Sequence, residues 1–186
     1  MIVKVMEIDL GHFLIRDWRR GDEESLARHA NNPKIFRNVR DRFPHPYTPE
    51  DARQWVERAS SEDPMTSFAI VADGEAVGGV GFFLQEDIFR RSVEIGYWLG
   101  EAYWGRGIAT DAVRAMSDYI FANFDVCRIF AGVFAWNPGS MRVLEKAGYV
   151  CEARMRKAAT KNGQTIDEFL YALVKEDQEE AAERDK

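Results

Sequence analysis

The stretch EAYWGRGIATDAV, residues 101–113, places two glycines around an arginine where an aromatic segment gives way to a helical pattern. Glycine adopts a positive φ at little cost, so Gly105 and Gly107 predict a tight turn into that helix. The first turn of a helix carries N–H groups without intrahelical partners and a partial positive charge. A loop without bulky side chains would let a phosphate reach them. The stretch therefore has three possible interpretations: a simple turn, a phosphate cradle, or half of a dinucleotide fingerprint.

The dinucleotide fingerprint fits the surrounding sequence least well. It requires Gly-x-Gly-x-x-Gly after the first strand of a parallel unit, and Thr110 stands at the third glycine position. The preceding strands are joined by short connections, one of them the hairpin signal Asp73-Gly74, which predicts antiparallel pairing. These three predicted strands are 65–73, 75–85 and 91–100.

Capping signals delimit the helices. A polar run opened by Asp22 predicts a helix to about Asn31. Thr48 as N-cap, with proline next, predicts a second helix to about Ser61. An amphipathic pattern follows Gly107, and the stretch from Asn137 to Gly148 begins with an N-cap and Pro138 and ends on a C-terminal glycine.

The remaining strands complete an α+β pattern. Residues 13–18 alternate like a first strand, and 127–135 form a continuous apolar run, which predicts a strand buried on both faces. A last hairpin turns at Lys161-Asn162-Gly163. We predict a single α+β domain over residues 1–175 around a mixed, mostly antiparallel sheet flanked by helices. Residues 176–186 form an acidic tail that is expected to fray.

Composition narrows the class of protein. The chain has 186 residues and a formal net charge of −6, which argues against nucleic acid as the main partner. No apolar run is long enough to span a membrane, and the N-terminal residues lack a secretion signal, so we expect a cytoplasmic protein without membrane contact. Cys127 and Cys151 are then expected to be reduced thiols in the core. The three scattered histidines predict no metal site.

Three segments together carry a resemblance to a known family. Trp104-Gly105-Arg106-Gly107-Ile108-Ala109 is similar to the phosphate loop [QR]-x-x-G-x-[GA] of the GNAT superfamily of acyl-CoA-dependent N-acyltransferases, with Trp104 departing from the usual Gln or Arg. NPGSMRVLEKAGY, residues 137–149, follows in the order expected of the family. With EIGYWLG before the loop and GQTIDEFLYALV at the end, the chain resembles the branch that acetylates ribosomal-protein N-termini.

The resemblance implies a cofactor site. The sheet would splay between the strands at 91–99 and 127–134, and acetyl-CoA would lie there as acetyl donor. The amides of 104–109 would hold the pyrophosphate, and Asn137 would contact the cofactor. The resemblance also implies that three residues of the preceding strand pair with the pantetheine arm: Tyr97, Trp98 and Leu99.

Two residues are candidates for the chemistry. Glu94 is the acid within an apolar strand, so it is a candidate base whose partial burial would tune it; alternatively it faces water or binds an arginine such as Arg91. Ser140 would sit near the cofactor sulfur and donate a proton to it, or would only satisfy backbone groups of its helix. Many relatives place a tyrosine acid where this chain has Leu144, and Tyr149 is expected in the core.

The acceptor is the least defined part of the prediction. Aromatic residues that could line its pocket, although such residues are more often core, are Phe36, Tyr47, Trp55 and Phe83. The leading hypothesis is an N-acetyltransferase acting on a primary amine such as a protein N-terminus. The alternatives are a polyamine, aminoglycoside or amino-acid-like acceptor, a non-catalytic acetyl-CoA-binding module and a nucleotide-dependent oxidoreductase. The oligomeric state stays open between monomer and homodimer.

Overall fold

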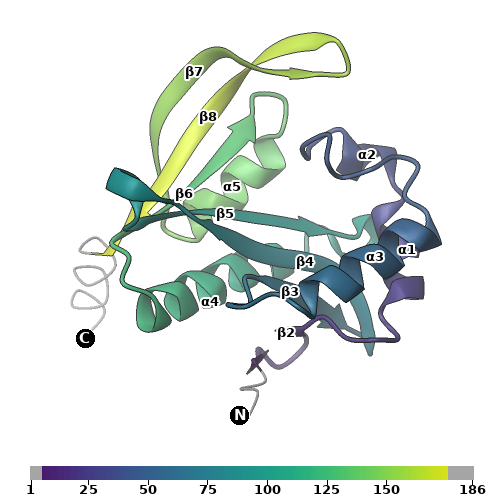
Figure 1. The fold of residues 1–186 in the computed structure, drawn as a ribbon. Helices are drawn as coiled ribbons and strands as arrows, with labels where there is room; N and C mark the ends of the chain where they lie inside the picture. Colours follow the sequence, from purple (N-terminus) through teal and green to yellow (C-terminus); the bar gives the residue numbers. More distant parts are fainter. Residues whose placement is uncertain (1–5, 176–186) are drawn as a thin grey trace. The chain divides into compact units, whose positions relative to one another are not determined.

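The computed structural model describes residues 6–175, in which eight strands form one mostly antiparallel sheet accompanied by five α-helices (Figure 1). The strand order is β1-β2-β3-β4-β5-β6-β8-β7. By its internal contacts the chain divides into two units. The first contains the residues up to Gly81 together with Tyr97–Ala112, and the second contains Phe82–Gly96 together with the residues from Val113 onward. The proposed acidic tail, 176–186, lies outside the described residues.

The first unit is a small antiparallel sheet covered by helices. Its strands are β1 (Glu7–Asp9), β2 (Leu14–Asp17), β3 (Ser67–Ala72) and most of β4 (Glu75–Leu84). Its helices are α1 (Glu23–Ala30), α2 (Pro33–Phe36) and α3 (Pro49–Ala59). β1 and α2 were not predicted, whereas the hairpin at Asp73-Gly74 is confirmed, with φ angles of 53° and 81°.

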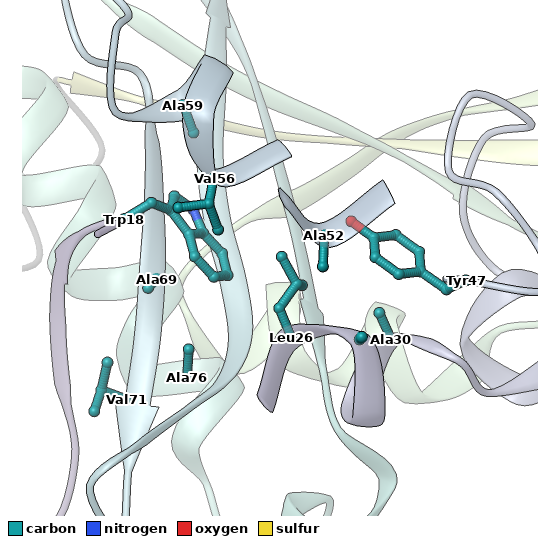
Figure 2. Packing of buried hydrophobic residues seen from close by; sticks show 11 residues of the cluster. Trp18, Leu26, Ala30, Tyr47, Ala52, Val56, Ala59, Ala69, Val71 and Ala76 are labelled. Atoms are coloured by element: carbon teal, nitrogen blue, oxygen red, sulfur yellow. The ribbon is translucent and has the colours of Figure 1, made fainter. Parts of the chain in front are cut away.

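Helices α1 and α3 pack together over β2 and β3 (Figure 2). Trp18, Leu26 and Val56 meet in this cluster, with alanines from the strands and helices between them. α1 is fixed to β2 by a buried ion pair, in which Arg16 donates two hydrogen bonds of 2.7 Å to the Asp22 carboxylate. The predicted cap of α3 is confirmed as a capping box formed by Thr48 and Asp51.

The second unit contains the other half of the sheet. Its own elements are β6 (Arg128–Phe134), α5 (Pro138–Lys146), β7 (Val150–Lys161) and β8 (Gln164–Val174). β5 (Ser92–Leu99) and α4 (Ile108–Asn123) each have residues in both units. β7 and β8 form the long hairpin at the top of Figure 1, and its predicted turn has Asn162 and Gly163 at φ 51° and 76°.

The expected splay concerns the pairing of β5 with β6. The two strands are parallel, and their ladder covers Ser92–Glu94 against Arg128–Phe130. β6 runs on to Phe134, and there its partner is β8. The β5–β6 ladder thus ends at Glu94 and Phe130, whereas β5 itself continues to Leu99.

Two expectations about burial are wrong. β6 is not buried on both faces, because its residues alternate between buried and less buried positions and Gly132 is exposed. The apolar run reflects partly covered aromatic residues such as Phe130, not a second packed layer. The cysteines are free thiols but not core residues, since Cys127 is half-buried and Cys151 is exposed.

Candidate functional site

The predicted phosphate loop is an exposed turn that ends where α4 begins. Gly105 and Gly107 have φ angles of 75° and 83°, the left-handed region in which glycine is favoured. A Cβ at Gly105 would have no atom within 4 Å, and one at Gly107 would meet the Asp111 carboxylate at 3.7 Å. The space beside Gly105 is therefore open to a ligand, and that beside Gly107 is bordered by the Asp111 carboxylate.

The first turn of α4 offers donors to that space. Gly107 acts as the helix cap, because its carbonyl accepts a hydrogen bond of 3.1 Å from the Asp111 N–H. The amides of Ile108, Ala109 and Thr110 come before this first helical bond and are thus the unpaired donors of a helix N-terminus. An anionic group such as a pyrophosphate fits this arrangement.

Trp104 departs from its expected role. Its N–H donates to the Glu101 carbonyl at 3.1 Å within the 3₁₀ turn Glu101–Tyr103 (η2), so this amide is already used. Its indole Nε1 donates to the Leu99 carbonyl at 2.7 Å. Trp104 therefore ties the loop back to the end of β5 and leaves the donor role to the residues after it.

Arg106 is held beside the loop by an aromatic residue that the sequence analysis did not identify. Its guanidinium carbon lies 5.0 Å from the ring centre of Tyr103, a cation–π contact. The Tyr103 hydroxyl donates to Asp73 at 3.2 Å, and desolvation together with this hydrogen bond raises the pKa of Tyr103. Because Asp111 places negative charge near Gly107, the positive charge of Arg106 matters for an anionic ligand.

The strand before the loop, β5, ends in the three residues proposed to pair with the pantetheine arm. Tyr97 is half-buried and Leu99 is buried, with its carbonyl taken by Trp104. The Trp98 ring packs against Phe43, with ring centres 5.6 Å apart, and lies over Gly79, where a Cβ would approach its Nε1 to 2.9 Å. The Trp98 side chain is thus part of the core packing, and its carbonyl oxygen faces β4, where a Cβ at Gly78 would approach it to 2.5 Å.

The second unit holds the other predicted residues. Asn137 caps α5, since its Oδ1 accepts a hydrogen bond of 3.2 Å from the Ser140 N–H. The cap uses the oxygen, and within residues 6–175 the Asn137 amide NH₂ group makes no hydrogen bond. Asn137 and Ser140, both half-buried, are therefore brought together in the first turn of α5.

Glu94 occupies the last pair of the β5–β6 ladder, opposite Phe130, and is half-buried as expected. Its suggested alternative partner, Arg91, lies 3.3 Å from the Asp125 carboxylate. Gly96, two residues further, is on the same face of β5 as Glu94. A Cβ there would lie 3.9 Å from the Phe83 ring, so Phe83 is near the candidate base.

The tyrosine expected in the core is there. Tyr149 is buried, and its hydroxyl shares a hydrogen bond of 2.8 Å with Ser117 Oγ. Leu144, at the position where many relatives carry a tyrosine acid, is fully buried.

The other three aromatic residues proposed for the acceptor pocket do not converge. Tyr47 is buried in the α1–α3 cluster, and desolvation raises its pKa to about 12. Trp55 packs on Trp18, with ring centres 6.5 Å apart, while Phe36 stacks on His45. Tyr47 is thus a core residue, and Trp55 is partly buried against the same cluster.

A hollow of about 600 Å³ lies between α1 and α3, with Ala27, Tyr47 and Pro49 among its lining residues. It shares no residue with the loop or with Tyr97–Leu99. Within residues 6–175 no cluster of three His, Cys, Asp or Glu is placed to hold a metal ion. No helix in this range is long and apolar enough to cross a bilayer.

Comparison with known proteins identifies the family. Residues 12–150 match the acetyltransferase (GNAT) domain. The chain belongs to the GNAT acetyltransferase family. It is 35% identical over 167 residues to the probable N-acetyltransferase YjcK of Bacillus subtilis, covering 85% of this chain and 91% of that protein. As a member of the family it is an acyltransferase.

Two curated relatives have named acceptors, and a solved structure has the same fold. This acetyltransferase is 26% identical over 167 residues to the L-amino acid N-acetyltransferase AaaT of Escherichia coli, covering 89% of this chain and all of that protein. It is 29% identical over 107 residues to the ribosomal-protein-serine acetyltransferase of E. coli, covering 58% of this chain and 59% of that protein. The structure of RimL, a ribosomal L7/L12 alpha-N-protein acetyltransferase in complex with coenzyme A, superposes with a TM-score of 0.80 at 21% identity. The superposition covers 91% of this chain and 98% of RimL.

Proposed function

We propose that this acetyltransferase moves the acetyl group of acetyl-CoA directly to a protein N-terminal α-amino group. The observation that carries the cofactor assignment is the exposed turn at Gly105 and Gly107, which leaves the first amides of α4 open to a pyrophosphate. Arg106 adds a positive charge beside it. When bound, acetyl-CoA supplies an activated thioester carbonyl and a thiolate leaving group.

The amine favours an N-terminal acceptor on chemical grounds. An α-amino group with a pKa near 8 is roughly a tenth neutral at pH 7, whereas a lysine-like amine is neutral only about 0.04% of the time. A protein N-terminus thus needs little help from a base. Such an acceptor fits the acid–base groups of this site. Glu94 is half-buried, and the Tyr149 hydroxyl already shares a hydrogen bond with Ser117.

In the proposed reaction, Glu94 accepts a proton from the attacking amine while the new N–C bond forms. The C–S bond then breaks, and the departing sulfur receives a proton from water, either directly or through the Ser140 hydroxyl, which regains its proton from water. Asn137 orients the cofactor through its NH₂ group, since its oxygen is fixed in the cap of α5. The amides after Gly107 hold the phosphates.

An amino-acid acceptor is the second candidate, because the relative AaaT aligns over a larger share of this chain than the ribosomal-protein-serine acetyltransferase does. A screen for thiol release from acetyl-CoA separates the candidates. It compares peptides beginning with Ser, Ala or Met with free amino acids, polyamines and aminoglycosides. Faster turnover of free amino acids than of the peptides would overturn the N-terminal proposal. Tight acetyl-CoA binding without turnover of any amine would instead indicate a non-catalytic binding module.

A further inference from the structure

Arg106, in the middle of the phosphate loop, is an exposed cation that pairs with no carboxylate of residues 6–175. Within the part of the chain that the structure describes, its guanidinium enters no hydrogen bond either. It lies over the ring of Tyr103, with 5.0 Å between the guanidinium carbon and the ring centre. The face of an aromatic ring attracts a cation but, unlike a carboxylate, does not neutralise its charge. Arg106 therefore presents a positive charge next to the first turn of α4.

The Tyr103 ring that carries Arg106 is itself held from two other sides. Its hydroxyl donates a hydrogen bond of 3.2 Å to the Asp73 carboxylate, in the turn between β3 and β4. The His29 ring, in the last turn of α1, meets the Tyr103 ring edge-on, with ring centres 5.7 Å apart and planes at 77°. His29 is in turn packed on Gly100, where a Cβ would approach its Nδ1 to 2.9 Å. Distant segments therefore fix Tyr103, whereas the exposed Arg106 side chain depends on the ring for its place.

Such a platform prepares an arginine for an anion. An unconstrained arginine samples many rotamers, and binding an anion costs the entropy of fixing them. A guanidinium held over a ring has lost part of that freedom before the ligand arrives. Its five N–H groups point outward in its plane, so contact with a ring leaves most of them available to phosphate oxygens. We propose that Tyr103 is a positioning residue that holds Arg106 ready for the pyrophosphate of acetyl-CoA.

This role of Tyr103 rests on the proposed cofactor site, in which the pyrophosphate binds the amides that follow Gly107. Asp111 borders Gly107, and its negative charge opposes an anion there. Arg106 directly precedes Gly107, so a guanidinium kept at the loop offsets that repulsion. Coenzyme A carries a second anionic group, the 3′-phosphate of its ribose. Arg106 is assigned to the pyrophosphate because it lies next to the amides proposed to bind that group.

Calorimetric binding of acetyl-CoA to the full chain tests this role without any acceptor amine. Arg106→Gln should weaken binding about tenfold, because it removes a charge-assisted hydrogen bond. Tyr103→Leu should weaken it about threefold, because the guanidinium loses its ring, whereas Tyr103→Phe keeps the ring and should stay within about twofold of the wild type. Arg58→Gln is the matched control. It removes the same charge from another cation–π contact, in which Arg58 lies 4.7 Å from the ring centre of Trp55, and should leave the affinity unchanged.

Combining the two changes separates positioning from a merely structural role. If Tyr103 acts through Arg106, Tyr103→Leu has no further effect on the affinity once Arg106→Gln is present. Equal losses in both backgrounds would overturn the proposal, as would an Arg106→Gln variant that binds acetyl-CoA like the wild type.

The same titrations with coenzyme A and with dephospho-CoA, which lacks the 3′-phosphate, locate the contact. The tenfold loss in Arg106→Gln should appear with both ligands. A loss confined to intact coenzyme A would place Arg106 at the 3′-phosphate and overturn its assignment to the pyrophosphate. A wild type that binds neither ligand nor acetyl-CoA would overturn the proposed cofactor site, and the role of Tyr103 with it.

Discussion

The indole Nε1 of Trp104 donates a hydrogen bond of 2.7 Å to the carbonyl oxygen of Leu99. This bond joins the first residue of the phosphate loop to the last residue of β5, across the 3₁₀ turn between them. Trp104 stands where the family usually has Gln or Arg, and its side chain here holds the loop to the strand. Trp104 therefore anchors the loop to the end of β5.

Replacing Trp104 by phenylalanine tests that role. The ring remains but the donor is lost, and a hydrogen bond of this kind is worth about 1 kcal/mol. We expect the KM for acetyl-CoA to rise about fivefold with kcat nearly unchanged, because the loop is less well held. Thermal unfolding of the variant serves as the control and should shift little. A change in kcat without a change in KM would contradict this role.

The two loop glycines should differ when each is replaced by alanine. Both have positive φ, so Gly105→Ala and Gly107→Ala should each lose about 1 kcal/mol of stability. Only Gly107 directly precedes the first amides of α4, and a methyl group there would stand in the path of the phosphates. We expect acetyl-CoA affinity, measured by calorimetry, to fall more than tenfold for Gly107→Ala and less than about threefold for Gly105→Ala. Equal losses would mean that both glycines only shape the turn.

Local signals in the sequence predict most of this fold. The Thr48-Pro49 and Asn137-Pro138 caps and the Asp73-Gly74 turn act within a few residues, so the chain itself determines them. The same kind of signal, Asn32-Pro33, begins α2, although the sequence led us to predict only a helix that ends at about Asn31.

Features that depend on distant neighbours were harder to predict. The apolar run of β6 looked doubly buried, because hydrophobicity alone does not tell whether a second layer covers a strand. Trp55 looked available for a pocket but packs on Trp18, whereas Tyr47 is buried and lines the hollow between α1 and α3. Tyr103 was missed because its role depends on Asp73 and Arg106, which it meets only in the fold.

The capping box of α3 should make stability depend on pH. The Thr48 hydroxyl and backbone N–H donate to the Asp51 carboxylate and lower its pKa. A lowered pKa stabilises the fold above the ordinary pKa of aspartate, and this contribution disappears as the pH falls through the lowered value. Thr48→Ala should lower the free energy of unfolding by about 1 kcal/mol at neutral pH. The difference in unfolding free energy between this variant and the wild type should become smaller in acid.

Denaturant unfolding at several pH values measures the difference in unfolding free energy between Thr48→Ala and the wild type. Ser61→Ala is the matched control near the other end of α3, where the Ser61 hydroxyl donates to the Glu57 carbonyl at 2.7 Å. No carboxylate takes part in that bond, so its cost should not vary with pH. A Thr48→Ala gap that widens in acid would contradict the assignment.

Tyr149→Phe distinguishes a core tyrosine from an acid. The Ser117 hydroxyl would keep its hydrogen bond of 2.8 Å to the Val113 carbonyl but lose the one shared with Tyr149. We expect a loss of about 1 kcal/mol in the free energy of unfolding and a kcat within about twofold of the wild type. Ser117→Ala removes the same bond from the other side and should behave alike. A large fall in kcat in an otherwise stable Tyr149→Phe variant would make this tyrosine the proton donor.

Glu94→Gln tests the proposed base, and the pH dependence of its effect is the decisive measurement. The substitution keeps the size of a half-buried side chain on β5, so acetyl-CoA binding should persist. General bases contribute about 100-fold or more to the rate. We expect kcat to fall about 100-fold, at the low end of this range, because an α-amine with a pKa near 8 needs only modest help from a base. The deficit should shrink between pH 6 and pH 9, because the amine then loses its proton to water without Glu94. Equal turnover of variant and wild type across that range would remove Glu94 from the mechanism and leave water as the base.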